Sequence, residues 1–231
     1  MHGKWSHPNT PLFRILETRL KKKGYIVEKP NMPWSRTRQY DQTYESSLED
    51  LSKVIQQYRK EGVKKVILIG HSLGGNAAIA YQAHVGDADA IVAITPGHNP
   101  YYRYTNDPRH MYILKKVEDK LKKNEGKSLI EFTDVNCDRR RNFTKSAEIF
   151  FSYFNPIGLG HMPATIKKIK KPTPILYIEG VQDHVHNGPE FIFSKVPYHT
   201  LSTYILTSGN HMTTPELSGE QIIEWLNFLS K

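Results

Sequence analysis

Residues 66–75 read VILIGHSLGG, and this stretch decides how the rest of the sequence is interpreted. The run 66–69 is β-branched and apolar, which is typical of a strand buried on both faces. Small residues from Leu73 to Val85 then predict a helix. Between them lies the pattern G-x-S-x-G, in the strand–turn–helix context that an exposed nucleophilic serine requires. Gly70 and Gly74 leave out side chains that would collide where strand and helix approach, and the helix N-terminus directs amides at a developing oxyanion. We therefore expect Ser72 to be a nucleophile.

A serine nucleophile needs a general base and a carboxylate that orients the base. Asp183 follows a predicted strand over 174–179, and His211 follows another over 203–207. The order Ser72, Asp183, His211 is the one expected when such a triad is built on a doubly wound sheet. Glu179 is the alternative acid if Asp183 points away. We expect the neighbouring His71 to shape the turn and not to act as the base.

Helices and strands alternate along most of the chain, which predicts an α/β fold with a mostly parallel, doubly wound sheet. A helix is expected from Pro11 to Gly24, a strand over Tyr25 to Glu28, and a helix with its apolar face from Leu48 to Tyr58. A strand over 90–95 and a closing helix over 216–229 extend the pattern. Residues 96–171 carry helical stretches at 111–123 and 146–154 and little strand signal. We expect a single domain over 1–231, with an inserted helical lid at about 96–171 over the carboxyl ends of the strands.

Several motifs together resemble the α/β-hydrolase superfamily over essentially the whole chain. GHSLGG resembles its nucleophile elbow, GVQDHV at 180–185 its acid loop, and SGNHMTTPE at 208–216 its histidine loop. The opening His-Gly-Lys-Trp at 2–5 resembles its oxyanion loop, which implies that the backbone amides of Lys4 and Leu73 form the oxyanion hole. The SYFNP and GHMP stretches, at 152–156 and 160–163, resemble a bacterial subgroup of uncharacterised hydrolases.

Two departures from the family pattern have consequences. The loop over 33–40 lacks the common Asp-Arg-Gly-His-Gly stretch, which leaves the subfamily open. In the family an apolar strand precedes the oxyanion loop and lies beside the nucleophile strand, whereas only Met1 precedes that loop here. We expect N-terminal strands to be missing from this chain and the native polypeptide to start further upstream. The compartment, cytoplasmic or exported, therefore stays open.

Composition excludes several other classes of protein. The chain has 231 residues, 38% of them hydrophobic, and its apolar runs are far shorter than the roughly 18 residues that span a bilayer. A single cysteine, Cys137, excludes a disulfide framework and a Cys-rich zinc site. The net charge is +9, and the basic residues behind it are scattered along the chain without a nucleic-acid-binding motif. This pattern favours a solvated basic surface. His184 and His186 are interpreted as exposed loop histidines, so no metal or organic cofactor is expected.

These observations predict a serine hydrolase that cleaves a carboxylic ester or related acyl bond of a small molecule. Thioesterase, peptidase and acyltransferase activities on the same triad stay open, as do a non-catalytic ligand-binding protein and an electrostatic binder of nucleic acid or membrane. Arg139 to Arg141 could bind an acidic substrate group, although a solvated loop is the simpler interpretation. Some aromatic side chains line either an acyl pocket or the core: Trp34, Tyr101, Tyr102, Phe150, Phe151, Tyr153 and Phe154. The sequence does not decide the substrate or the oligomeric state.

Overall fold

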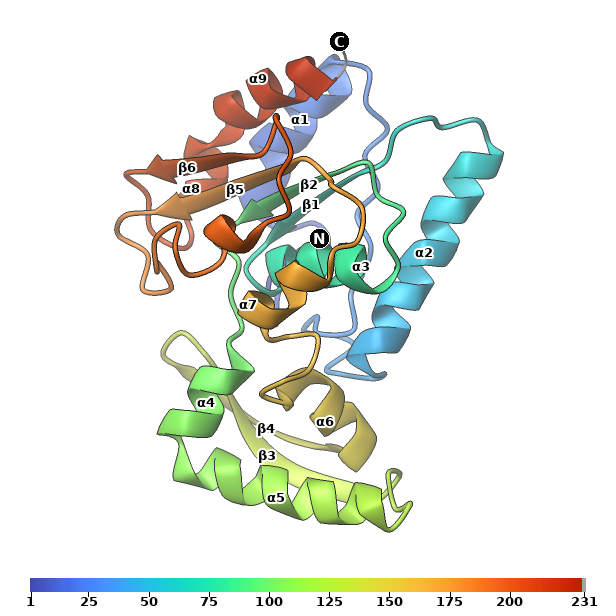
Figure 1. Cartoon of the computed structure of the whole chain (residues 1–231), viewed down its shortest axis with the longest axis vertical. Coiled ribbons are helices and arrows are strands. Elements are labelled where there is room, and N and C mark those ends of the chain that lie inside the picture. Colours follow the sequence, from blue (N-terminus) through green and yellow to red (C-terminus); the bar gives the residue numbers. More distant parts are fainter. Residues whose placement is uncertain (230–231) are drawn as a thin grey trace.

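A computed structural model describes residues 1–229 and has a four-stranded sheet at its centre (Figure 1). The strands are β1 (Ile67–His71), β2 (Ala90–Ile94), β5 (Ile175–Gly180) and β6 (Thr203–Thr207). They lie in the order β1-β2-β5-β6, and every neighbouring pair is parallel. The expected parallel α/β sheet is confirmed. All four strands point their carboxyl ends to the same edge, where the candidate residues gather.

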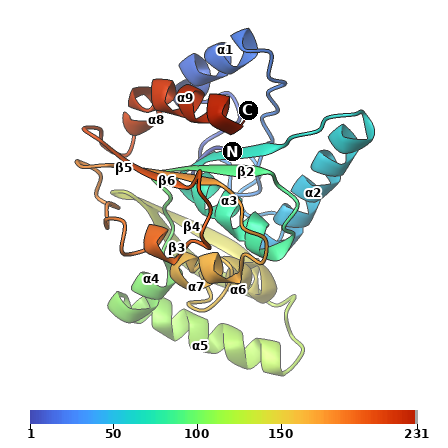
Figure 2. The same ribbon diagram turned by 45° about the horizontal axis from the view of Figure 1, so that its top comes forward.

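Helices cover both faces of this sheet (Figure 2). One face packs on α1 (Arg14–Lys22), which follows a 3-10 turn (Pro11–Phe13), and on α9 (Gly219–Leu229), which follows the short α8 (Thr214–Leu217). The other face packs on α2 (Tyr44–Lys60) and α3 (Leu73–His84). Strand β2 is buried throughout and sends alternate side chains to the two faces, which is why its sequence reads as continuously apolar. Among residues 1–229 no helix is long and apolar enough to cross a membrane.

The segment between β2 and β5 differs from the helical insertion that the sequence predicts. It contains α4 (Pro100–Asn106), α5 (Pro108–Lys122), α6 (Ala147–Phe154), α7 (Met162–Thr165) and a 3-10 turn (Ile166–Lys168). Between α5 and α6 lies an antiparallel hairpin of β3 (Leu129–Asn136) and β4 (Arg139–Ser146), which the sequence analysis missed. Strand β4 reads RRRNFTKS, and only Phe143 of its eight residues is buried. Its polar sequence gives almost no strand signal, and pairing with β3 creates the strand.

Most aromatic side chains of this segment belong to the hydrophobic core. Phe150, Tyr153 and Phe154 are at most 1% exposed, and Phe132 packs edge-to-face on Phe150 and Phe154. Tyr101 and Tyr102 on α4 are exposed. None of the seven aromatic residues considered from the sequence lines the cavity beside Ser72 described below. The core interpretation therefore holds for the buried members.

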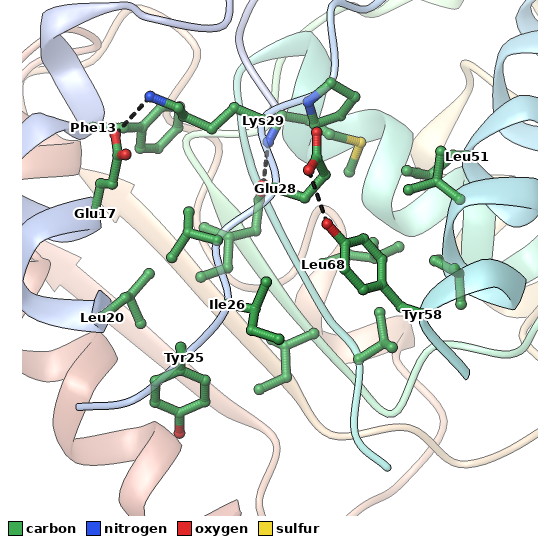
Figure 3. A pocket seen from close by; sticks show the side chains of 18 of the residues that line it. Phe13, Glu17, Leu20, Tyr25, Ile26, Glu28, Lys29, Leu51, Tyr58 and Leu68 are labelled. Carbon is green, nitrogen blue, oxygen red and sulfur yellow. Dashed lines mark hydrogen bonds and ion pairs between the residues drawn. The ribbon is translucent and has the colours of Figure 1, made fainter. Parts of the chain in front are cut away.

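The predicted strand over Tyr25 to Glu28 is wrong, because these residues have no strand conformation. The segment runs alongside β1 but is separated from it by an apolar groove, whose walls come from α1 and α2 (Figure 3). A strand needs a hydrogen-bonded neighbour, and the place where that neighbour would lie is this groove. The partner that would give this segment the hydrogen bonds of a strand does not lie beside it.

Candidate active site

Ser72 lies in a sharp turn between β1 and α3, with backbone angles of φ 55° and ψ −123°. A side-chain-bearing residue rarely adopts a positive φ, and such strain is concentrated at functional sites. The turn is tight: a Cβ on Gly70 would lie 2.0 Å from the carbonyl oxygen of Gly74. Gly74 is close to a different neighbour, since its Cβ would lie 2.4 Å from the carbonyl oxygen of Met1. The glycines are required, as expected, although Gly74 makes room for the amino-terminal loop.

The loops after β5 and β6 bring Asp183 and His211 into contact. The Nδ1 of His211 lies 2.8 Å from Oδ2 of Asp183, and both residues are less than a tenth exposed. The backbone N–H of Val185 donates to the other carboxylate oxygen at 3.0 Å. Burial acts to raise the pKa of Asp183, but the hydrogen bond and charge of His211 hold it below its ordinary value. Asp183 is therefore an ionised acceptor that orients the imidazole.

His71 supports His211 from behind. Its Nε2 lies 2.8 Å from the carbonyl oxygen of His211, and the two rings lie 4.7 Å apart between centroids. Burial, together with the neighbouring imidazole, lowers the pKa of His71 to about 3. A neutral ring held by a backbone hydrogen bond positions the His211 loop and is a poor proton acceptor.

The other acidic and imidazole groups near this edge have different partners. Glu179, the alternative acid, accepts hydrogen bonds from the phenol of Tyr204 at 2.7 Å and pairs with His186 at 3.1 Å. His184 is mostly exposed, with its Nδ1 3.3 Å from Oδ1 of Asp183. Asp183, His184 and His211 each offer an atom within 4.8 Å of the others, so they are the residues that could hold a metal ion. Nδ1 of His211 and Oδ2 of Asp183 are already in contact with each other at 2.8 Å.

The space above Ser72 is bordered by Gly97 and by residues 2–5, which are called the oxyanion loop here after the family motif that they resemble. A Cβ on Gly97 would lie 3.2 Å from Oγ of Ser72 and 3.9 Å from Cε1 of His211, so both side chains border the same small space. Gly3 lies against the serine from the other side, where its Cβ would lie 3.0 Å from that of Ser72. Within residues 1–229 neither the backbone N–H of Lys4 nor that of Leu73 donates a hydrogen bond. Both are available as donors to an oxyanion.

A cavity of about 420 Å³ opens from this point. Its lining includes Ser72 and His211 from the strand ends, the oxyanion loop, and residues 136–139 and 141 of the β3–β4 hairpin. The hairpin therefore reaches the edge of the sheet at which the candidate residues lie. Whether the whole insertion acts as a lid stays a prediction.

A buried ion pair joins the hairpin to the oxyanion loop. Nζ of Lys4 lies 3.0 Å from Oδ1 of Asp134, which is fully buried, and donates also to the carbonyl oxygen of Val135 at 3.1 Å. Oδ2 of Asp134 accepts from the phenol of Tyr40 at 2.7 Å. Burial opposes ionisation of Asp134, but the charge and hydrogen bond of Lys4 together with the hydrogen bond of Tyr40 outweigh it and keep the pKa of this carboxyl below its usual value. Asn136 adds a hydrogen bond to the carbonyl oxygen of Lys4 at 3.0 Å.

Sequence reasoning did not predict the roles of three residues that shape the site. Asp134 lies 130 residues from its partner Lys4, so no local pattern signals it. Asn76, buried on α3, donates to the carbonyl oxygens of Gly97 and His98 and fixes the loop over the serine. The only signal for Gly97 was a Pro-Gly pair directly after the end of a predicted strand.

Comparison with known proteins agrees with this architecture. No protein-family model and no functionally curated protein matches the sequence. Among solved structures, a chain described under the metagenome-derived lipolytic enzymes LipS and LipT matches with a TM-score of 0.66 at 15% identity, over 98% of this chain and 91% of the other. Est1E from Butyrivibrio proteoclasticus with bound ferulic acid matches with a TM-score of 0.66 at 17% identity, over 100% and 88%. The peroxisomal α/β-hydrolase Lpx1 from Saccharomyces cerevisiae matches with a TM-score of 0.57 at 12% identity, over 99% and 75%. The chain therefore has the α/β-hydrolase fold.

Proposed function

We propose that this protein is a serine hydrolase that cleaves carboxylic esters or related acyl bonds of small molecules. The observation that carries the proposal is the 2.8 Å contact between Asp183 and His211, with His211 and the strained Ser72 bordering one cavity. A carboxylate, an imidazole and a serine at three strand ends supply a nucleophile, a base and a group that orients the base. The similarity to lipolytic enzymes and to an esterase supports the same class of reaction.

In the proposed reaction Nε2 of His211 takes the proton of Ser72 Oγ as that oxygen bonds to the acyl carbon. The carbonyl electron pair moves to oxygen, where the backbone N–H groups of Lys4 and Leu73 donate hydrogen bonds to the oxyanion. Collapse expels the alcohol oxygen, which receives the proton from His211 and leaves an acyl-serine. Water then attacks with His211 again as base, which releases the acid and restores Ser72.

The test is labelling by a fluorophosphonate probe, followed by peptide mapping and by hydrolysis of short para-nitrophenyl esters. Ser72 should carry the label, and Ser72→Ala and His211→Ala should each lose at least about a thousandfold in kcat/KM. His184→Ala is the matched control, because His184 also lies beside Asp183 but is mostly exposed, and it should keep most of the activity. An unlabelled, folded protein without esterase activity would favour the non-catalytic ligand-binding alternative.

Thioester hydrolysis is the second candidate that the comparisons favour. The thioesterase domain from the curacin biosynthetic pathway matches with a TM-score of 0.54 at 14% identity, over 97% of this chain. The same nucleophile and oxyanion hole serve oxygen and sulfur leaving groups, so the assay should pair each ester with the thioester of the same acid. A higher kcat/KM for the thioester, at equal leaving-group reactivity, would assign this activity instead.

A further inference from the structure

The cavity beside Ser72 has a cationic wall. Arg139 and Arg141 on β4 line it. Arg36 lines it from the loop over 33–40. Asp138, in the hairpin turn, is the one acidic residue in this lining. Lys4 also borders the cavity, but its ammonium group is neutralised by Asp134. Three arginines and one acidic residue therefore line the cavity.

The register of the hairpin explains why these arginines lie on one side. Arg139 pairs with Asn136 and Arg141 with Asp134, whereas Arg140 pairs with Val135. Side chains alternate across a strand, so Arg139 and Arg141 share the face that carries Asn136 and Asp134. Arg140 points to the opposite face and does not line the cavity. The guanidinium of Arg141 is also held in place, 5.0 Å from the ring of Trp5.

We propose that the substrate carries an anionic group, such as a carboxylate, which Arg139 and Arg141 bind while the acyl carbon lies at Ser72. This proposal names the substrate class and rests on the proposed function. Guanidinium groups bind carboxylates through paired, charge-assisted hydrogen bonds, which give orientation as well as affinity. Arg36 also lines the cavity and adds attraction for an anion.

The test compares two esters of nearly equal size, para-nitrophenyl valerate and the para-nitrophenyl half-ester of glutarate, which ends in a carboxylate. The ratio of kcat/KM for the charged ester to that for the neutral one should fall about tenfold or more in Arg139→Ala/Arg141→Ala. Arg140→Ala is the matched control and should leave the ratio unchanged. Added salt should lower the ratio for the wild type and have little effect in the double variant.

Failure of the anion site and failure of the proposed function give different results. If the neutral ester is hydrolysed and the double variant keeps the wild-type ratio, the anion site is wrong while the proposed function stands. If neither ester is hydrolysed, the proposed function is wrong, and calorimetric titration of glutarate into the Ser72→Ala protein still decides the anion site. Glutarate should bind there and lose its affinity in the background of Arg139→Ala/Arg141→Ala. Equal binding with and without the two arginines would overturn the proposal.

Discussion

The ion pair between Lys4 and Asp134 allows one prediction to be worked through in detail. Asp134 is fully buried and the Lys4 side chain is 7% exposed, so neither charge is compensated by water. The Asp134→Asn substitution would remove the buried counter-charge of the Lys4 ammonium group. It would leave the packing around that group nearly unchanged, because the two side chains have nearly the same volume. Arg103, which lies 3.3 Å from Asp134, would still pair with Asp107 at 3.0 Å. The loss therefore falls on Lys4.

Removing one partner of a buried ion pair costs about 3–5 kcal/mol of unfolding free energy. For a chain of this size 1 kcal/mol corresponds to about 2–4 °C in Tm, so Asp134→Asn should lower the Tm by about 6–20 °C. Urea unfolding followed by circular dichroism measures the free energy directly. Esterase kcat should fall as well, because Lys4 supplies a proposed oxyanion N–H and its loop is held by this pair.

Two further variants separate the charge effect from a general loss of packing. Lys4→Met/Asp134→Leu removes both charges and should recover most of the stability, since an apolar pair of similar volume replaces a buried ion pair at little cost. Asp107→Asn removes the exposed partner of Arg103 and should cost at most about 1 kcal/mol. If Asp134→Asn unfolds within 1 kcal/mol of the wild type, the account of this pair as a buried, mutually dependent contact is refuted.

Three other predictions follow from the geometry of the site. Burial lowers the pKa of His71 and of His98 to about 3, below the value near 6.5 of an unfolded chain. The unfolded state therefore binds more protons, and stability should fall by up to about 1.4 kcal/mol per pH unit per histidine as the pH drops below 6.5; urea unfolding at pH 7.5, 6.5 and 5.5 measures this, and equal stabilities would contradict it. Gly97→Ala should lower esterase kcat/KM about tenfold with little change in Tm, because the added Cβ would lie 3.2 Å from Ser72 Oγ. Asp183→Asn should lower kcat on the order of 10⁴-fold and leave KM nearly unchanged, as steady-state kinetics would show.

The parts of the fold that the sequence predicts are those whose signal is local. Residues 66–69 are apolar on both faces and lead into a glycine-flanked serine, and these features describe a buried strand and a tight turn without reference to any other segment. Asp183 and His211 were found because parallel strands end at one edge, so a residue directly after each strand falls near Ser72. The position of these residues follows from topology once the strands are known.

The parts that were missed depend on partners distant in the sequence. The polar run RRRNFTKS becomes a strand only because β3 pairs with it, and the segment 25–28 is not one because no strand among residues 1–229 pairs with it. The contact between Lys4 and Asp134 likewise needs the hairpin to be placed against the oxyanion loop before it can exist. These contacts between distant residues leave no local pattern in a single sequence.

The register of the hairpin connects its pairing to the chemistry of the cavity. Three consecutive arginines carry no directional information in the sequence, but pairing with β3 sends Arg139 and Arg141 to the cavity and Arg140 away from it. The partner strand β3 also carries Asp134, which pairs with Lys4, so the strand that aligns the cationic wall also contacts the oxyanion loop. A slip of one residue would exchange the two faces of β4 and put Arg140 where Arg139 and Arg141 now lie. Because that slip would also move the buried Phe143 of β4 to the exposed face, the hydrophobic core opposes any change in the charge of the cavity.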